Sequence, residues 1–165
     1  MTKYFYLDAS ALAKRYALEI GTPVANYLFA SQSHDNFLTL TVGLAEVISI
    51  LVRKRNAGKI APAIFSQALL DFNAEIVNAA AVQKLVADNS LVMDALSLII
   101  AHSINATDAV LLRSAIDLAA ILRMHGDELI LVASDQRLLR AAQTEGLLIF
   151  NPETQTIADL NALLI

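Results

Sequence analysis

The stretch YFYLDASALAKRY, from Tyr4 to Tyr16, joins a strand to a helix. It opens with aromatic and apolar residues, as a buried strand does, and this run ends abruptly at the acidic Asp8. Small residues and a helical pattern follow at once, as in the strand–helix units of α/β proteins. A carboxylate at the end of a buried strand loses hydration and needs a compensating partner. Asp8 is therefore the first candidate functional residue.

The composition predicts one globular domain that spans residues 1–165. Hydrophobic residues make up 56% of the chain and charged residues 17%, so most elements should be buried on more than one side. Every long apolar stretch is interrupted by a charged residue, and none reaches the roughly 18 residues of a membrane span. LVMDALSLIIAHSI, residues 91–104, is therefore interpreted as a core helix, and we expect no membrane partner.

Cysteine is absent, which excludes disulfides and thiolate metal sites. The N-terminus shows no signal-peptide pattern, so we expect a cytoplasmic protein. The net charge of −4 by itself argues against a general polyanion binder. If four carboxylates surround a cation, however, 12 of the 16 acidic residues remain against 12 basic ones, and the overall sign is not decisive.

Short apolar runs alternate with helical patterns along the chain. Strands are predicted at residues 3–7, 36–40, 128–134 and 147–150, with a further one at 74–79. Helices are predicted at residues 10–18, 23–30, 62–73, 82–104, 108–124 and 136–146, and another begins at Thr41, its expected cap, and ends before Gly58. This alternation predicts a mostly parallel sheet that is covered by helices on both faces.

Four acids fall where such a sheet would gather them. Asp8 and Asp135 each follow a predicted strand, and the carboxyl ends of parallel strands meet at one edge of a sheet, where ligands bind. Glu46 lies among apolar residues in the first turns of a helix that starts at that edge, and Asp108 opens another helix. Capping of a helix explains Asp108 or Asp135 equally well when each is taken alone. One shared cause explains all four better.

That shared cause would be a divalent cation. Carboxylates held a few ångströms apart repel one another unless positive charge offsets them. An all-oxygen site suits Mg²⁺ or Mn²⁺. Metal sites of this kind act on phosphate esters, so the predicted substrate is a phosphodiester.

Four segments resemble, in order and spacing, the conserved blocks of the PIN-domain nucleases, and most of all the VapC-type toxins of bacterial toxin–antitoxin pairs. The segments are YLDASALAKRY, LTLTVGLAEVISIL, NATDAVLLRSAI and LVASDQRLLRAAQTEGL, with FNP at 150–152 after the last strand. The resemblance runs from about Lys3 to Pro152. It implies a PIN-like three-layer α/β/α sandwich with a mostly parallel central sheet.

The resemblance also implies an activity and partners. The family members are metal-dependent endoribonucleases, so it implies a Mg²⁺- or Mn²⁺-dependent ribonuclease, the toxin of a type II toxin–antitoxin pair. Such toxins form homodimers and are silenced by a small antitoxin. Residues 79–105 depart from the family pattern, being longer and more apolar, and Val110 and Leu111 differ from the residues of many relatives.

The family's site residues carry over to matching positions in this chain. Asp8 and Asp108 would be the main metal ligands, Glu46 a ligand directly or through water, and Asp135 the fourth acid, bound through water. Ser10 matches a small hydroxyl residue that supports the first acid. Ser134 matches a Ser/Thr position just before the fourth.

RNA also needs cations near the acids to offset its phosphate charge. Four cations closely follow an acid in these segments and are candidate substrate contacts, with solvated helix faces as the alternative: Lys14 and Arg15 after Asp8, Arg113 after Asp108, and Arg137 after Asp135. The basic cluster at 53–59 is interpreted first as a helix C-terminus and second as an RNA tether. The three histidines have no ligand spacing and receive no role.

Two other classes of protein remain as alternatives. One is a catalytically silent PIN-fold module that binds RNA or protein. The other is a phosphotransfer receiver-like domain, which also gathers acids around Mg²⁺. A receiver needs a lysine at the end of a late strand, and no lysine follows a predicted strand after Lys84, so this alternative is disfavoured.

Overall fold

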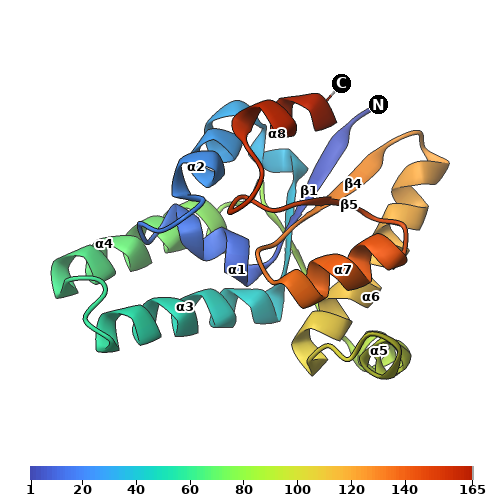
Figure 1. Ribbon diagram of the computed structural model, residues 1–165, viewed down its shortest axis with the longest axis horizontal. Coiled ribbons are helices and arrows are strands. Elements are labelled where there is room, and N and C mark those ends of the chain that lie inside the picture. Colours follow the sequence, from blue (N-terminus) through green and yellow to red (C-terminus); the bar gives the residue numbers. More distant parts are fainter. Residues whose placement is uncertain (165) are drawn as a thin grey trace.

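A five-stranded, entirely parallel sheet forms the centre of the computed structural model, which describes residues 1–164 (Figure 1). The strand order is β3-β2-β1-β4-β5. The strands are β1 (Lys3–Leu7), β2 (Phe37–Leu40), β3 (Gln83–Leu85), β4 (Glu128–Val132) and β5 (Leu148–Phe150).

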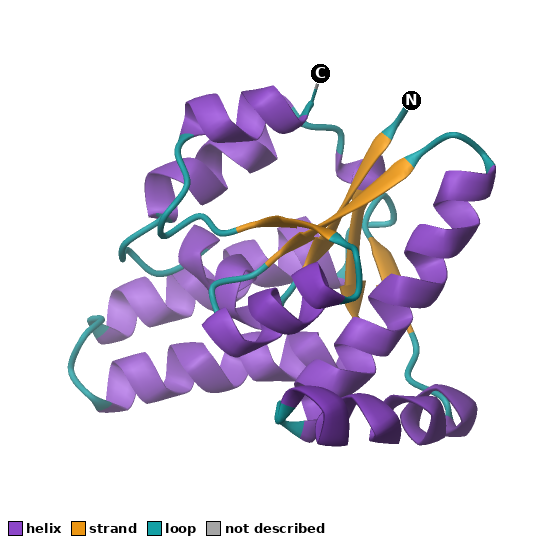
Figure 2. Cartoon of the chain, turned by 45° about the vertical axis from the view of Figure 1, so that its right-hand side comes forward, coloured by secondary structure: helices purple, strands orange, loops and turns teal. Residues whose placement is uncertain are grey.

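Helices cover both faces of this sheet (Figure 2). One face carries α1 (Ala9–Leu12), α2 (Thr22–Ser31), α3 (Thr41–Asn56), α4 (Pro62–Phe72) and α8 (Ile157–Leu163). The other carries α5 (Asn89–His102), α6 (Ala106–Met124) and α7 (Gln136–Thr144). Short 3₁₀ turns lie at Ala13–Arg15 and His34–Asn36. The predicted three-layer α/β/α sandwich is confirmed.

The central strand β1 contributes side chains to both layers of core. Phe5 and Leu7 pack into the cluster beneath α1 to α4, whereas Tyr6 packs into the cluster beneath α6 and α7. All three are at most 1% exposed. The hydroxyl of Tyr6 donates a hydrogen bond to Ser114 Oγ at 2.9 Å, which satisfies the only polar atom of that side chain. This burial on both faces explains the unbroken apolar run in the sequence.

The strand order reverses at β1, because the chain adds β2 and β3 on one side and β4 and β5 on the other. The ends of β1 and β4 lie side by side, with Leu7 opposite Val132. The next residue continues the pairing, since the Asp8 amide donates to the Val132 carbonyl at 2.9 Å. Such a switch point opens a crevice beyond the carboxyl ends of the strands.

The strand predicted at residues 74–79 is wrong. Asn73–Val77 instead forms a π-helical turn that continues α4 and buries Ile76 completely. The third strand is β3, which pairs with β2 and lies inside the predicted helix 82–104. That helix starts later because Asp88 caps α5, its side chain accepting from the Leu91 amide at 2.8 Å.

The prediction that residues 91–104 form a core helix is also wrong in part. Of α5, only Ala95 and Leu98 are buried, while Met93, Leu96 and Ile100 are 64%, 45% and 84% exposed. The helix packs along α6 and turns its other side outward (Figure 1). Within residues 1–164 no single helix is long and apolar enough to cross a membrane; α5 and α6 reach that length only together, and they meet at a bend of 110°.

One predicted cap is also wrong, and one close approach of the backbone was not predicted. Thr41 does not cap α3, since Leu40 holds that position and the Thr41 hydroxyl donates to the Leu85 carbonyl at 2.6 Å. Gly21 precedes α2 at a φ of 91° and lies so close to the FNP turn that a Cβ there would stand 2.8 Å from the Pro152 carbonyl oxygen. Only glycine fits both conditions.

Candidate active site

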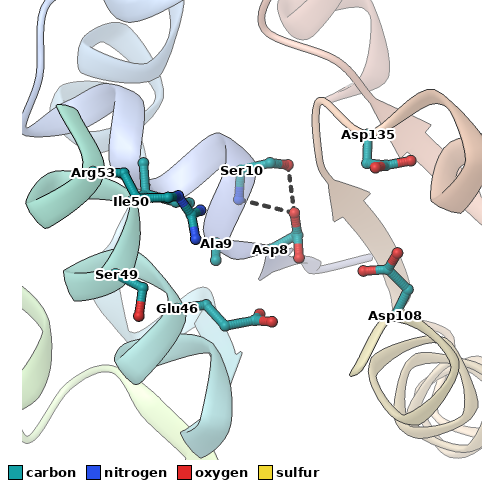
Figure 3. A pocket seen from close by; sticks show the side chains of 9 residues that line it. All are labelled: Asp8, Ala9, Ser10, Glu46, Ser49, Ile50, Arg53, Asp108 and Asp135. Carbon is teal, nitrogen blue, oxygen red and sulfur yellow. Dashed lines mark hydrogen bonds between the residues drawn. The ribbon is translucent and has the colours of Figure 1, made fainter. Parts of the chain in front are cut away.

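A cavity of about 410 Å³ opens at the switch point of the sheet, and all four predicted acids line it (Figure 3). Asp8 follows β1, Glu46 lies on α3, Asp108 on α6, and Asp135 follows β4. Glu46 and Asp108 extend toward Asp8 from opposite sides. The fold thus brings together carboxylates that are up to 127 residues apart in the sequence.

Asp8 and Asp135 do cap helices, but each cap engages one carboxylate oxygen. Asp8 Oδ2 accepts both the amide of Ser10, at 2.9 Å, and the Ser10 hydroxyl. Asp135 Oδ1 accepts the amides of Arg137 and Leu138 at 2.7 and 3.2 Å. The second oxygen of each aspartate takes no part in these bonds. Capping and ligand binding are therefore compatible at both positions.

Asp108 is not a cap. The cap of α6 is Asn105, whose side-chain oxygen accepts the Asp108 amide at 2.9 Å. Asp108 lies in the first turn, and Glu46 lies in the second turn of α3 with its side chain half-buried. Neither carboxylate is needed to terminate a helix, so the capping alternative does not account for them.

The site raises the pKa of three of its acids. Burial raises the pKa of Asp8, which hydrogen bonds from Ser10 counteract and the charge of Asp135 reinforces. Burial and then the charge of Asp8 raise the pKa of Glu46. Burial, followed by the charges of Asp8, Asp135 and Glu46, raises the pKa of Asp108 to about 7. The carboxylates therefore oppose one another's ionisation, as close acids without enough positive charge do.

Ser10 and Ser134 connect the two strand ends. The Ser134 amide donates to Ser10 Oγ at 2.8 Å, and Ser10 Oγ donates in turn to Asp8 Oδ2. These two hydrogen bonds fix the orientation of the Asp8 carboxylate. Ser134 Oγ is a buried hydroxyl for which the described residues supply no hydrogen-bond partner. Of the two predicted supporting residues, Ser10 lines the acidic cavity, and Ser134 is linked to it through the hydrogen bond to Ser10.

The donor set fits a hard divalent cation, because four carboxylates supply oxygen ligands and their mutual repulsion favours a bound positive charge. Across the described 164 residues, no three His, Asp or Glu side chains stand in a geometry that would already hold an ion. Binding would therefore require these side chains to turn inward.

The predicted substrate cations lie in different surroundings. Lys14 is 2% exposed and pairs with Glu153 at 2.5 Å, and Arg15 pairs with Glu75 at 2.8 Å. Arg113 pairs with Asp117 on its own helix. Among these four, Arg137 is the one for which no carboxylate partner is found within residues 1–164, and its side chain is exposed beside the Asp135 cap.

Four residues that line the cavity were not predicted as site residues: Ala9, between Asp8 and Ser10, and three residues of α3. Ser49, Ile50 and Arg53 follow Glu46 by three, four and seven positions and therefore share its face of α3. The helical period would have indicated them once Glu46 was chosen. The position of Arg53 in the basic cluster 53–59 predicts a helix C-terminus, yet its charge also favours the ionised form of Glu46 and counteracts the rise in the pKa of Glu46.

Comparison with solved structures identifies the architecture. PAE2754 from Pyrobaculum aerophilum aligns with a TM-score of 0.58 and 16% identity over 99% of this chain and 96% of its own. VapC20 from Mycobacterium tuberculosis, described as a toxin that cleaves the sarcin–ricin loop, aligns with a TM-score of 0.59 and 17% identity over 92% of this chain and 99% of its own. The chain has the fold of a VapC-type PIN domain.

A third structure, FitAB bound to an IR36 DNA fragment, aligns with a TM-score of 0.53 and 16% identity over 92% of this chain and 97% of that chain. No model of a protein family and no curated protein matches the sequence. The four acids are thus identified from their order in the chain and their convergence in space, while sequence identity to these structures stays low.

Proposed function

We propose that this PIN domain is a divalent-metal-dependent endoribonuclease that hydrolyses RNA phosphodiester bonds, with Mg²⁺ or Mn²⁺ as its cofactor. One observation carries the proposal: carboxylates from four separate segments line one cavity at the switch point of a parallel sheet. The charges of three neighbouring acids contribute to the raised pKa of Asp108, and a bound cation would reverse that contribution.

Asp8 and Asp108 would hold the cation, with Glu46 and Asp135 completing the acidic wall. When bound, a divalent ion supplies positive charge for the phosphate oxygens and makes water in the site more acidic. The protein's own part is to present oriented oxygens. Ser10 holds one oxygen of Asp8, and the first turn of α7 holds one oxygen of Asp135, so these two carboxylates are restrained, while Glu46 and Asp108 cap no helix and can turn toward the ion.

We further propose that the protein is the toxin of a type II toxin–antitoxin pair, acts in the cytoplasm as a homodimer, and is silenced by a small antitoxin. The name of VapC20 as a toxin supports the first part. The apolar outer side of α5, formed by Met93, Leu96 and Ile100, supports the homodimer, because exposed apolar strips of this kind mark protein interfaces.

The test is cleavage of RNA by the purified protein. Parent, Asp8→Asn and Asp108→Asn are incubated with a fluorescent single-stranded RNA in Mg²⁺, in Mn²⁺ and in chelator, and products are resolved by electrophoresis. Asp94→Asn is the matched control, since Asp94 is an exposed acid on α5 outside the cavity.

We expect cleavage by the parent and by Asp94→Asn in either metal, none in chelator, and a loss of at least about 100-fold in both site variants. Cleavage by Asp108→Asn at the parent rate would refute the proposal. RNA binding that is equally tight in chelator, without any cleavage, would favour a catalytically silent module.

A further inference from the structure

Three cavities meet along one side of α3. The acidic cavity shares Ile50 and Arg53 with a second cavity of about 270 Å³, whose other lining residues are Lys54, Ala57 and Lys59. A third cavity, of about 280 Å³, also reaches Ile50 and Lys54 but is otherwise lined by residues outside α3, among them Ser134. Two grooves therefore lead away from the four acids. We call them the α3 groove and the Ser134 groove.

The α3 groove is lined by cations whose charge is largely free. Within the described part of the chain, neither Arg53 nor Lys59 forms an ion pair, and both side chains are exposed. Lys54 is the third cation, and it pairs with Glu19 at 2.5 Å. No acidic residue lines this groove. Its walls therefore attract a polyanion.

The Ser134 groove has the opposite balance. Its two cations, Lys14 and Lys54, face three carboxylates, those of Glu19, Asp135 and Glu153. Both cations already form ion pairs. Lys14 pairs with Glu153 at 2.5 Å and lies 3.6 Å from Glu19, and Lys54 pairs with Glu19. A chain of phosphates that entered this groove would meet net negative charge.

We propose that the α3 groove binds the sugar–phosphate backbone of a single-stranded RNA on one side of the bond to be cut, with Arg53 on the phosphate nearest the acids and Lys59 on a phosphate farther out. The inference rests on the proposed function, because it takes the acidic cavity as the place of cleavage. It also predicts an asymmetric footprint, since only one of the two grooves offers free cations.

The spacing of the residues supports this assignment. Arg53 lies two turns beyond Glu46 on the same face of α3, about 10 Å along the helix axis, and it lines both the acidic cavity and the α3 groove. Its guanidinium extends from α3 toward Ala9 and the acids (Figure 3). Arg55 is two residues away but turns elsewhere, with its guanidinium 4.4 Å from the centre of the Phe65 ring. One helix thus carries both a groove arginine and a matched non-groove arginine.

The experiment measures RNA binding separately from cleavage. A fluorescein-labelled twelve-nucleotide oligouridylate is titrated with protein in Mg²⁺ at several KCl concentrations and followed by anisotropy, with Asp108→Asn in every protein to prevent cutting. Arg53→Ala/Lys59→Ala is compared with Arg55→Ala/Arg140→Ala, which removes the same charge from exposed residues outside the groove. Circular dichroism verifies that both double variants are folded.

For single strands each phosphate contact contributes about 0.7 to the slope of log K against log salt. Loss of two contacts should lower that slope by about 1.4 and weaken binding on the order of tenfold or more near 0.1 M salt, while the control pair leaves the slope unchanged. With a cleavable RNA and active protein, shortening the strand on one side of the cut should raise KM, and shortening it on the other side should not. Arg53→Ala/Lys59→Ala should abolish that difference.

Equal losses in both double variants would overturn the assignment, because charge alone would then explain the effect. Parent-like affinity and KM in Arg53→Ala/Lys59→Ala would overturn it too, while cleavage by the active protein would leave the proposed function intact. If a glutamate-rich peptide binds through Arg53 and Lys59 and the RNA does not, the groove belongs to a protein partner. If the protein that retains Asp108 cleaves no RNA in Mg²⁺ or Mn²⁺, that result counts against the proposed function and not against the groove assignment.

Discussion

Replacing Asp108 by asparagine should stabilise the metal-free protein at neutral and alkaline pH. The pKa of Asp108 is about 7 in the folded chain and 3.8 for a free aspartate. The folded state therefore holds a proton that the unfolded state releases. The stability contributed by this group is fully present below pH 4 and is lost as the pH rises through about 7. Asparagine does not ionise and escapes that loss.

The rise in the pKa of Asp108 from 3.8 to about 7 is equivalent to a free-energy cost of about 4 kcal/mol for ionising this group in the folded state. Asp108 is only half-buried, so solvent screening reduces the expected gain to about 1–2 kcal/mol. For a chain of this length each kcal/mol shifts Tm by about 2–4 °C. Asp108→Asn should thus melt about 2–8 °C above the parent at pH 8.5 in chelator and within a degree or so of it at pH 4.

The assay is thermal or urea unfolding by circular dichroism at both pH values, with Asp94→Asn as a control that should follow the parent throughout. Addition of Mg²⁺ at pH 8 should then reverse the order, since ligand at about 100 times its Kd stabilises the parent by about 2.7 kcal/mol and the variant has lost a ligand. An Asp108→Asn protein that is no more stable than the parent at pH 8.5, or equally stabilised at pH 4, would refute the reasoning.

Two further outcomes follow from other parts of the structure. Gly21→Ala should lower the free energy of unfolding, measured in urea, by about 2 kcal/mol or more, because alanine is strained at this positive φ and its Cβ meets the Pro152 carbonyl. Gly146→Ala is the control: its φ is also positive but nothing lies within 4 Å, so it should lose only the stability that the backbone strain costs. Equal losses in the two variants would show that the close approach at Gly21 is unimportant. Ile100→Asp should be monomeric by light scattering while the parent and Leu18→Asp, an equally exposed control, are dimeric; a dimeric Ile100→Asp would exclude the outer side of α5 as the interface.

The sequence predicted the parts of the fold whose patterns are local and strong. β1 and β4 are apolar runs because both faces of the sheet are covered there. The ends of these two strands predicted where Asp8 and Asp135 would lie. β3 was missed because it has only three residues, Gln83–Leu85, and its identity as a strand comes from pairing with β2 and not from its own pattern. Edge strands of this length carry little local signal.

The substrate cations show a different limit of prediction. Proximity in sequence drew attention to Lys14, Arg15 and Arg113, yet their charges are matched by carboxylates such as Glu153 and Glu75, which lie 60 or more residues away from Lys14 and Arg15. Whether a cation is free depends on tertiary pairing, which no local pattern reveals. The helical period did hold the information that Arg53 shares a face with Glu46.

The energetics of the four acids argue for a role beyond structure. If the cluster served only to terminate helices, Asp8 and Asp135 would suffice, since α6 is capped by Asn105 and α3 begins without a side-chain cap. Glu46 and Asp108 add no cap and raise the cost of ionisation in the cavity. A residue that destabilises the fold and caps no helix is typical of a functional site, where activity is kept at the expense of stability. The gain in stability expected for Asp108→Asn therefore tests whether this carboxylate destabilises the fold, and the cleavage assay tests what it is kept for.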